Sequence, residues 1–266
     1  MKNLLFAVLL SVGLGTSVVF GQATTFTKTD LSQTEIDSIV KKFTRNERLF
    51  REALNVYAFK RDASISTIGM GGEITGTYKR DSYLTFDAEG RRIEKILFAP
   101  ISTLTELIIT QSDIENLGGL DPFAIEPKKI DLYNFTYLGK EKIDELNLFV
   151  FDVAPKVMPK SEKEGRLFQG RIWVDDRDFL IVKSKGKAVP EWKERFPTIE
   201  TWRENIDGKY WFPAYSSSDD ELVFKQGNVV KVKVRVKYYD YALGRSDVKI
   251  IGEEDVVEPT PPVKKP

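Results

Sequence analysis

Hydrophobic residues recur at every second position over long stretches between Val56 and Tyr238, and this alternation constrains the fold more than any other feature of the sequence. Successive side chains of a β-strand point to opposite faces, so a period of two predicts strands with one apolar and one polar face. The clearest strand is the last one. Its apolar face carries Val230, Val232, Val234, Val236 and Tyr238, and its charged face carries Lys231, Lys233, Arg235 and Lys237.

Short turn signals separate these strands, at 69–72, 88–90, 139–140, 175–178, 207–208 and 226–228. Strands that are joined by short turns pair consecutively and antiparallel. We therefore expect a mainly β (α+β) protein with a curved antiparallel sheet of about 11 strands, apolar on one face and charged on the other throughout.

One long helix precedes the strands. Ser32 and Glu35 have the spacing of a capping box, which predicts a helix over residues 33–54. Its apolar face carries Ile36, Ile39, Val40, Phe43, Phe50 and Leu54, and its other faces carry Lys41, Lys42, Arg45, Glu47 and Arg51. A second, short helix is expected within 110–125, where Thr110 or Ser112 can act as the cap and Ile114 and Leu117 are apolar.

One long helix and one short helix cannot cover the apolar face of so large a sheet. We therefore expect an incompletely filled apolar cavity, which is where a ligand would bind. The candidate lining residues come from the first strands and from the short helix, acting as a lid: Tyr57, Phe59, Ile65, Tyr78, Leu84, Phe86, Ile114 and Leu117. An ordinary sheet core is the simpler explanation of the aromatic residues among them, and both interpretations stay open.

The two ends of the chain differ from the rest. Residues 1–23 have a short basic start, an apolar run and small residues, which is typical of a cleaved export signal, and no cysteine follows that could be acylated. This predicts a periplasmic, soluble protein without a lipid anchor. Residues 30–251 form the predicted domain, and the Pro-rich segment 252–266 is expected to be disordered and dispensable for folding.

The composition excludes several kinds of chemistry. The chain has no His and no Cys, which excludes a Ser-His-Asp triad, a cysteine nucleophile and any ordinary zinc site. Lys and Arg number 40, as do Asp and Glu, so the net charge is zero and does not favour a nucleic-acid partner. The acidic clusters 175–178 and 219–221 are interpreted as turn residues. We expect no enzymatic activity, no metal and no cofactor.

Two stretches of the sequence resemble a known family. Residues 76–81 (GTYKRD) resemble the glycine–aromatic–Lys-Arg-Pro segment of the LolA family of periplasmic lipoprotein carriers, with Asp81 in the place of the proline. Residues 137–144, 149–156 and 170–175 resemble the middle of the sheet in the LolA/LolB/RseB-like superfamily. The resemblance covers roughly residues 30–242, and it implies a half-open β-barrel that holds lipid acyl chains under a helical lid.

The resemblance implies a carrier that binds the acyl chains of lipoproteins or other lipids for sorting to the outer membrane. The alternative is an RseB-like module that senses lipid or lipoprotein and regulates a membrane partner. A hydrolase that uses only carboxylates is a third, weaker hypothesis. The expected partners are acyl chains and a membrane-protein donor or acceptor, and the expected state is a monomer.

Arg80 is the remaining candidate. Counting in twos from Ile74 places Arg80 on the apolar face with Leu84 and Phe86, where a guanidinium needs a partner. One interpretation is a bulge or turn at 79–82 that rotates Arg80 into solvent. The other, which the resemblance implies, is that Arg80 lies at the rim of the cavity and holds the 110–125 lid shut through its backbone carbonyls.

Overall fold

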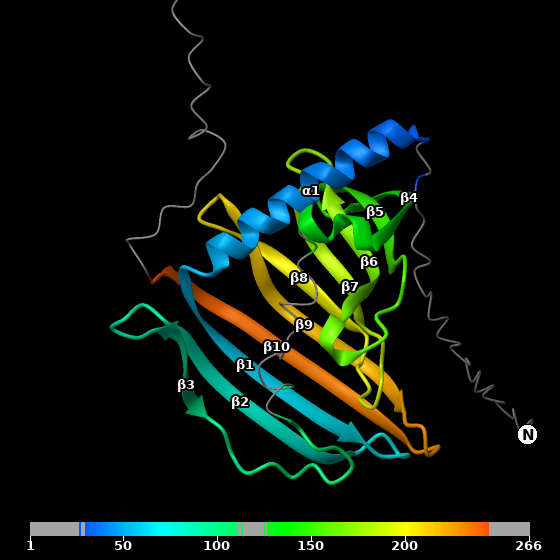
Figure 1. Cartoon of the computed structure of the whole chain (residues 1–266). Coiled ribbons are helices and arrows are strands. Elements are labelled where there is room, and N and C mark those ends of the chain that lie inside the picture. Colours follow the sequence, from blue (N-terminus) through cyan, green and yellow to red (C-terminus); the bar gives the residue numbers. More distant parts are fainter. Residues whose placement is uncertain (1–26, 28–29, 111–112, 114–124, 126, 245–266) are drawn as a thin grey trace, which may run out of the picture.

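The computed structural model describes residues 27, 30–110, 113, 125 and 127–244 of the chain. The predicted export signal 1–23 and the Pro-rich segment 252–266 lie outside the described residues. The described part contains one α-helix, two 3-10 helices and ten strands (Figure 1). In chain order these are α1 (Gln33–Leu54), β1 (Tyr57–Ile68), β2 (Ile74–Phe86), β3 (Arg92–Phe98), η1 (Pro127–Leu132), β4 (Tyr133–Ile143), β5 (Leu146–Pro155), η2 (Glu162–Glu164), β6 (Leu167–Asp175), β7 (Ile181–Val189), β8 (Ile199–Ile206), β9 (Tyr210–Val223) and β10 (Val229–Leu243).

All ten strands form one antiparallel, curved sheet in the order β3-β2-β1-β10-β9-β8-β7-β6-β5-β4. The predicted consecutive pairing is confirmed within 57–98 and within 133–243. It is broken between β3 and β4, which become the two edges of the sheet, while β1 pairs with β10 from the end of the chain. The sheet therefore joins its two halves through contacts between residues far apart in the sequence.

The strand number is one below the expected 11, and two predicted turns are parts of strands. Gly139 does not end a strand, because it lies in β4 at a shift of register opposite Val150. Residues 219–221 belong to β9, where Asp219 pairs with Lys233 and Glu221 pairs with Lys231. Opposite charges on neighbouring strands favour pairing, which explains why acidic residues continue the strand here.

The expected turn at 175–178 is confirmed. One carboxylate oxygen of Asp175 accepts hydrogen bonds from the backbone N–H groups of Arg177 and Asp178, at 2.8 and 3.0 Å. Asp side chains often close turns in this way, so these carboxylates have a structural role at the β6–β7 connection.

The first helix has the predicted bounds and the predicted capping box. The Ser32 hydroxyl accepts a hydrogen bond from the Glu35 backbone, and the Glu35 carboxylate accepts one from the Ser32 backbone. The helix lies diagonally across one face of the sheet, which we call the inner face (Figure 1). Its N-terminal half packs on β4–β7, where Phe43 lies 5.8 Å from the ring of Phe151.

Glu47 is a correction to the predicted helix faces, because it is buried against the sheet. Its carboxylate accepts two hydrogen bonds from the Arg203 guanidinium of β8, at 2.6 and 2.9 Å. The side chains are 1% and 5% exposed, and the guanidinium also lies 4.2 Å from the ring of Phe50. A charged residue is tolerated on the buried face of α1 because its partner is supplied by the sheet.

Two glycines let the neighbouring strands β6 and β7 and the ring of Phe168 pack closely together. Gly170 on β6 is paired with Gly186 on β7, and the ring of Phe168 lies over Gly186. A Cβ atom built on Gly186 would lie 2.3 Å from this ring and 2.4 Å from the Gln169 carbonyl oxygen. Only glycine fits at this point.

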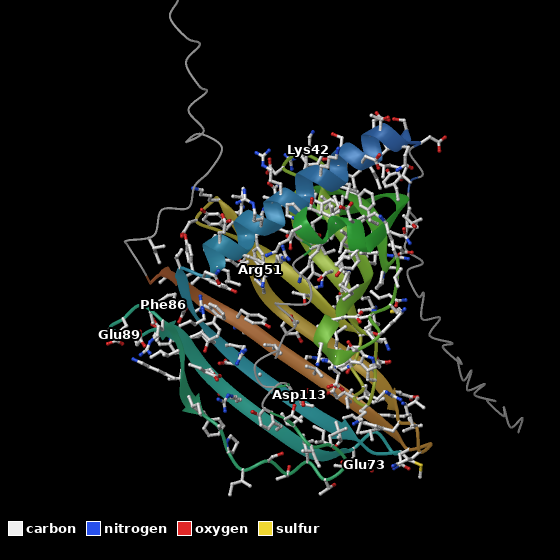
Figure 2. All side chains as sticks on the ribbon, viewed as in Figure 1. Lys42, Arg51, Glu73, Phe86, Glu89 and Asp113 are labelled. Carbon is white, nitrogen blue, oxygen red and sulfur yellow. The ribbon has the colours of Figure 1, made fainter. Side chains whose placement is uncertain are left out.

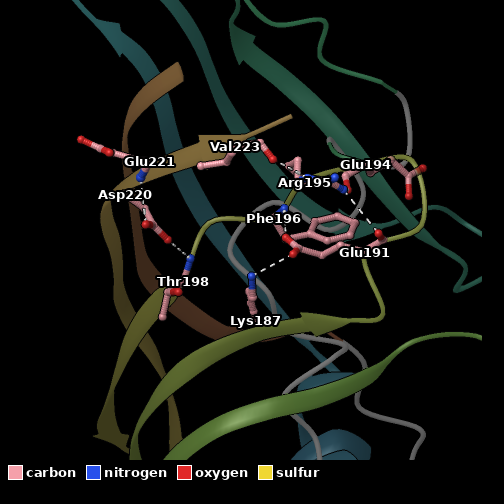
Figure 3. Close-up of polar contacts among 9 residues, drawn as sticks. All are labelled: Lys187, Glu191, Glu194, Arg195, Phe196, Thr198, Asp220, Glu221 and Val223. Atoms are coloured by element: carbon pink, nitrogen blue, oxygen red, sulfur yellow. Dashed lines mark hydrogen bonds and ion pairs between the residues drawn. The ribbon is translucent and has the colours of Figure 1, made fainter. Parts of the chain in front are cut away.

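The loop between β7 and β8 is fixed to β9 (Figure 3). The Arg195 guanidinium donates to the Val223 carbonyl at 2.7 Å, and the Thr198 backbone N–H donates to the Asp220 carboxylate at 2.7 Å. Lys187 and Glu191 form an ion pair at the start of the loop. The loop is therefore joined to β9, the strand with which β8 also pairs.

The outer face is not charged throughout, as the sequence suggested. Leu148, Val150, Trp173 and Val182 form a buried apolar cluster on this face of β5–β7. The Lys183 ammonium lies 4.6 Å and 4.3 Å from the rings of Trp173 and Trp202, and it is paired with Glu200. A lysine at a strand position can thus cover aromatic rings rather than mark a solvated face.

Within the described ranges, none of the helices has the length and apolar character needed to cross a bilayer.

Candidate functional site

The inner face of β1, β2 and β10 carries an apolar cluster, which we call the floor. The register places Phe59 opposite Leu84 and Ile65 opposite both Tyr78 and Val234. The buried members of the floor are Phe59, Ala63, Ile65, Val234, Val236 and Tyr238, and Leu54, Tyr78, Leu84, Leu104, Ile109, Ile199 and Tyr241 pack against them, partly buried. Among the residues of α1, only Leu54 at its last position belongs to this group, because the rest of the helix crosses the other half of the sheet.

Four of the candidate lining residues therefore come together in the floor: Phe59, Ile65, Tyr78 and Leu84. Tyr57 lies in a neighbouring cluster below the end of α1, with its ring 4.9 Å from that of Phe212. Burial and the hydrogen bond from its hydroxyl to Asp207 raise the pKa of Tyr57 to about 12. Tyr57 is thus a neutral packing residue at neutral pH.

Phe86 lies at the end of β2, next to the end of α1, and Glu73 lies at the opposite end of the sheet (Figure 2). The Arg92 guanidinium of β3 lies 4.9 Å from the Phe86 ring and 5.5 Å from the Phe59 ring. It donates hydrogen bonds to the carbonyls of Leu54 and Tyr57, so Arg92 ties β3 to the end of α1. Phe86 borders the floor at this corner.

The segment after β3 returns over the inner face of β2. The Thr103 backbone N–H donates to the Thr77 carbonyl at 3.0 Å, and Leu104 and Ile109 pack against the floor. A Cβ atom on Gly76 would lie 2.6 Å from the Thr103 carbonyl oxygen, which explains the glycine in this motif. The same segment leaves Ile101 and Ile108 93% and 90% exposed.

The expected lid helix lies largely outside the described residues, and so do Ile114 and Leu117. Its start is described. Thr110 and Asp113 exchange hydrogen bonds, with the Asp113 backbone donating to the Thr110 hydroxyl and the Thr110 backbone donating to the Asp113 carboxylate. This reciprocal pattern is typical of a capping box with Thr110 in the capping position, and Ser112 lies outside the described residues.

Arg80 is on the inner face, paired with Ala63, and the β1–β2 register runs without a shift through residues 79–82. The register against β3 does shift between Asp81 and Ser82, but the Arg80 side chain is only 15% exposed, so the interpretation that a bulge rotates it into solvent is wrong. Its described partner also differs from the expected lid carbonyls. Arg80 donates to both carboxylate oxygens of Glu94 on β3, at 3.0 and 2.8 Å. The largely buried guanidinium is thus paired within the sheet.

Glu94 accepts two further hydrogen bonds, from Arg61 at 3.0 Å and from the Ser82 hydroxyl at 2.6 Å. The hydrogen bond from Arg80 lowers the pKa of Glu94 to about 2, and the Ser82 hydroxyl and the charge of Arg61 act in the same direction. The carboxylate is therefore ionised at neutral pH. One carboxylate and two guanidiniums meet here beside the floor.

We expect the contribution of Glu94 to stability to depend on pH. The folded-state pKa lies below the ordinary value of 4.5, so the stabilisation is complete above about pH 4.5 and is lost as the pH falls toward 2. The measurement is the urea unfolding of the wild type and of Glu94→Gln over this range. The difference in stability between the two proteins should shrink with falling pH, and a difference that is constant with pH would contradict the ion pairing.

A separate pocket of about 410 Å³ opens between β8, β9 and β10, where β9 and β10 are no longer paired. It is lined by Glu204, Ile206, Ala214, Tyr215, Lys237, Tyr238, Tyr239, Asp240 and Tyr241. No pattern in the sequence predicts this pocket, because it arises where two strands separate.

Sequence reasoning missed two charged residues of the site. Arg61 could have been found, since counting in twos from Phe59 places it on the apolar face, and the structure shows its side chain 4% exposed. Glu94 had no such signal. The alternation in β3 is weak, and Ile96, Leu97 and Phe98 are all more than half exposed. Only the pairing of β3 with β2 brings Glu94 to Arg80.

No protein-family model matches this sequence, and no curated protein matches it. Several solved structures are similar to the chain, including the following three. A DUF1329 family protein from Desulfovibrio piger is 14% identical, with a TM-score of 0.39, over 83% of this chain and 96% of the other. A putative outer membrane lipoprotein-sorting protein domain from Vibrio parahaemolyticus is 12% identical, with a TM-score of 0.32, over 79% and 94%. MucB is 11% identical, with a TM-score of 0.25, over 77% and 92%.

Proposed function

We propose that this protein is a periplasmic carrier that holds the acyl chains of a lipid or lipoprotein on the floor and passes them toward the outer membrane. The observation that supports it is the unequal covering of the inner face. The helix covers the half formed by β4–β8, whereas the described cover of the floor consists of Leu54, Leu104 and Ile109 around half-buried Tyr78 and Leu84. The six buried members of the floor are already out of water, whereas the partly buried Tyr78 and Leu84 would gain stability when a hydrocarbon chain covers them.

We propose a binding role rather than a catalytic one. Three carboxylates of the described sheet have structural tasks. Asp175 closes a turn, and Asp152 is paired with Arg171 across β5 and β6. Glu94 is held ionised by two arginines, which makes it a poor proton donor or acceptor near neutral pH.

The carrier proposal predicts that affinity grows with the length of the acyl chain. Each buried methylene contributes about 0.8 kcal/mol, which is about a fourfold gain in affinity for each added carbon. Displacement of a fluorescent fatty acid by saturated fatty acids of increasing length measures this directly. Absence of binding at every length would refute the carrier proposal.

Leu84→Gln should weaken binding by about tenfold, because it places an amide in the floor where an apolar side chain contacts the ligand. Thr85→Gln is the matched control, since Thr85 is its neighbour on β2 and points to the outer face. Equal loss of binding in both variants would show that the effect comes from β2 as a whole and not from the floor.

A further inference from the structure

The carboxylate of Glu94 is held as a bound anion would be. One of its oxygens accepts from Arg61, Arg80 and Ser82, and the other accepts from Arg80. The donors belong to β1 and β2, which lie inside the sheet, whereas Glu94 belongs to the edge strand β3. We call Arg61, Arg80 and Ser82 the cradle. Two forked guanidiniums and a hydroxyl are the donors that bind carboxylates and phosphates elsewhere in proteins.

Three guanidiniums lie at this end of the inner face. Those of Arg61 and Arg80 both bind the carboxylate of Glu94, and that of Arg92 lies 5.5 Å from the Phe59 ring. The acid on the returning segment, Glu106, is bonded to Thr75 near the β1–β2 turn. Thr75 and Arg80 are five residues apart on β2, which places Glu106 about 17 Å from the cradle along the strand.

The cradle directly borders the floor. Arg80 lies between Tyr78 and Leu84 on the inner face of β2, and Arg61 lies between Phe59 and Ala63 on the inner face of β1. The Arg80 and Glu94 side chains are 15% and 24% exposed, so this ion pair is partly open to solvent, whereas Arg61 is 4% exposed. A chain that lies on the floor thus has its polar end beside Arg80.

We propose that the cradle binds the anionic head group of a lipid whose acyl chain lies on the floor, with the head group taking the place of Glu94 on the guanidiniums. This inference rests on the proposed function and adds the chemical class of the ligand. Carboxylate and phosphate head groups share the required chemistry, since both accept two parallel N–H bonds from a guanidinium. Displaced Glu94 is on an edge strand, where water can solvate its carboxylate.

The test compares four ligands with the same twelve-carbon chain at pH 8 in the fluorescence displacement assay. They are dodecanoate, dodecyl phosphate, 1-dodecanol and dodecyltrimethylammonium. We expect the two anions to bind the wild-type protein about tenfold more tightly than the alcohol, and the cation to bind most weakly. The tighter of the two anions identifies carboxylate or phosphate as the preferred head group. The anion affinities should fall with added salt, whereas the affinity for 1-dodecanol should not.

Two variants change the cradle in opposite directions. Glu94→Gln removes the competing carboxylate, so it should tighten the binding of both anions about fivefold or more and leave 1-dodecanol unchanged. Arg80→Gln should weaken the anions about tenfold and leave 1-dodecanol unchanged. Lys79→Gln is the matched control, because it removes a positive charge from the outer, exposed face of β2 next to Arg80. It should change none of the affinities by more than twofold.

The outcomes separate this inference from the proposed function. If the wild type binds dodecanoate, dodecyl phosphate and 1-dodecanol equally, the head-group site is refuted and the carrier remains. If it binds none of the four, the carrier itself is refuted. If Arg80→Gln loses 1-dodecanol together with the anions, its effect is on the floor, and a Glu94→Gln protein that binds anions no more tightly than the wild type then refutes the cradle.

Discussion

Replacing Glu47 by Gln should lower the free energy of unfolding by about 3–5 kcal/mol, because it leaves the Arg203 guanidinium buried without its carboxylate. This ion pair joins α1 to β8, and Arg203 also packs on Phe50 and donates to the Ile181 carbonyl. The loss should be seen as a lower midpoint of urea unfolding. Its size follows from the burial of the charge that remains rather than from the attraction between the two charges.

Two companion variants make this prediction specific. Glu52→Gln removes a carboxylate from the same helix, where Glu52 and Arg48 form an exposed pair, and it should change the stability by less than about 1 kcal/mol. The double variant Glu47→Leu with Arg203→Met removes both buried charges, and it should regain most of the stability that Glu47→Gln loses. A Glu47→Gln protein as stable as the wild type would contradict the burial of this pair.

Gly186→Ala should cost about 3 kcal/mol, since the added methyl group would overlap the Phe168 ring and the Gln169 carbonyl oxygen. The carbonyl belongs to the neighbouring strand and cannot move without breaking the β6–β7 pairing. Thermal unfolding measures the effect, and the expected change is a lower midpoint with the secondary structure retained.

Gly71→Ala is the control for this substitution. The Cβ atom there would meet only the carboxylate of Glu73, which is the end of a flexible side chain and can turn away. We expect a change within about 1 kcal/mol, of either sign. If Gly186→Ala were as well tolerated as Gly71→Ala, the close packing of β6, β7 and Phe168 would have to be wrong.

Local patterns accounted for the elements of this fold. The capping box at Ser32 and the apolar stripe after it set the bounds of α1. The period of two placed Arg80 on the inner face with Leu84, because a strand has no freedom in the direction of alternate side chains. The same counting put Phe59 and Ile65 on one face of β1, and the register then confirmed that they lie together with Tyr78 and Leu84.

Two of the wrong predictions from the sequence share one physical reason. Charged residues usually face water, which favours the solvated side of α1 for Glu47 and a turn for residues 219–221. Both assignments fail where the sheet supplies a counter-charge. Arg203 is 156 residues away from Glu47, and Lys233 pairs with Asp219 across β9 and β10. No local pattern reveals such a partner.

The sequence by itself determined the strands, the helix and the direction of their side chains, because these follow from the spacing of apolar residues that are close together in the sequence. The tertiary structure alone decided the strand order, with β1 beside β10 and β3 at the edge, and with it the meeting of Arg61, Arg80 and Glu94. Pairing between distant strands depends on contacts over the whole inner face. The pairing of the charged residues and the packing of the floor therefore depend on the complete sheet and cannot be predicted from any one strand.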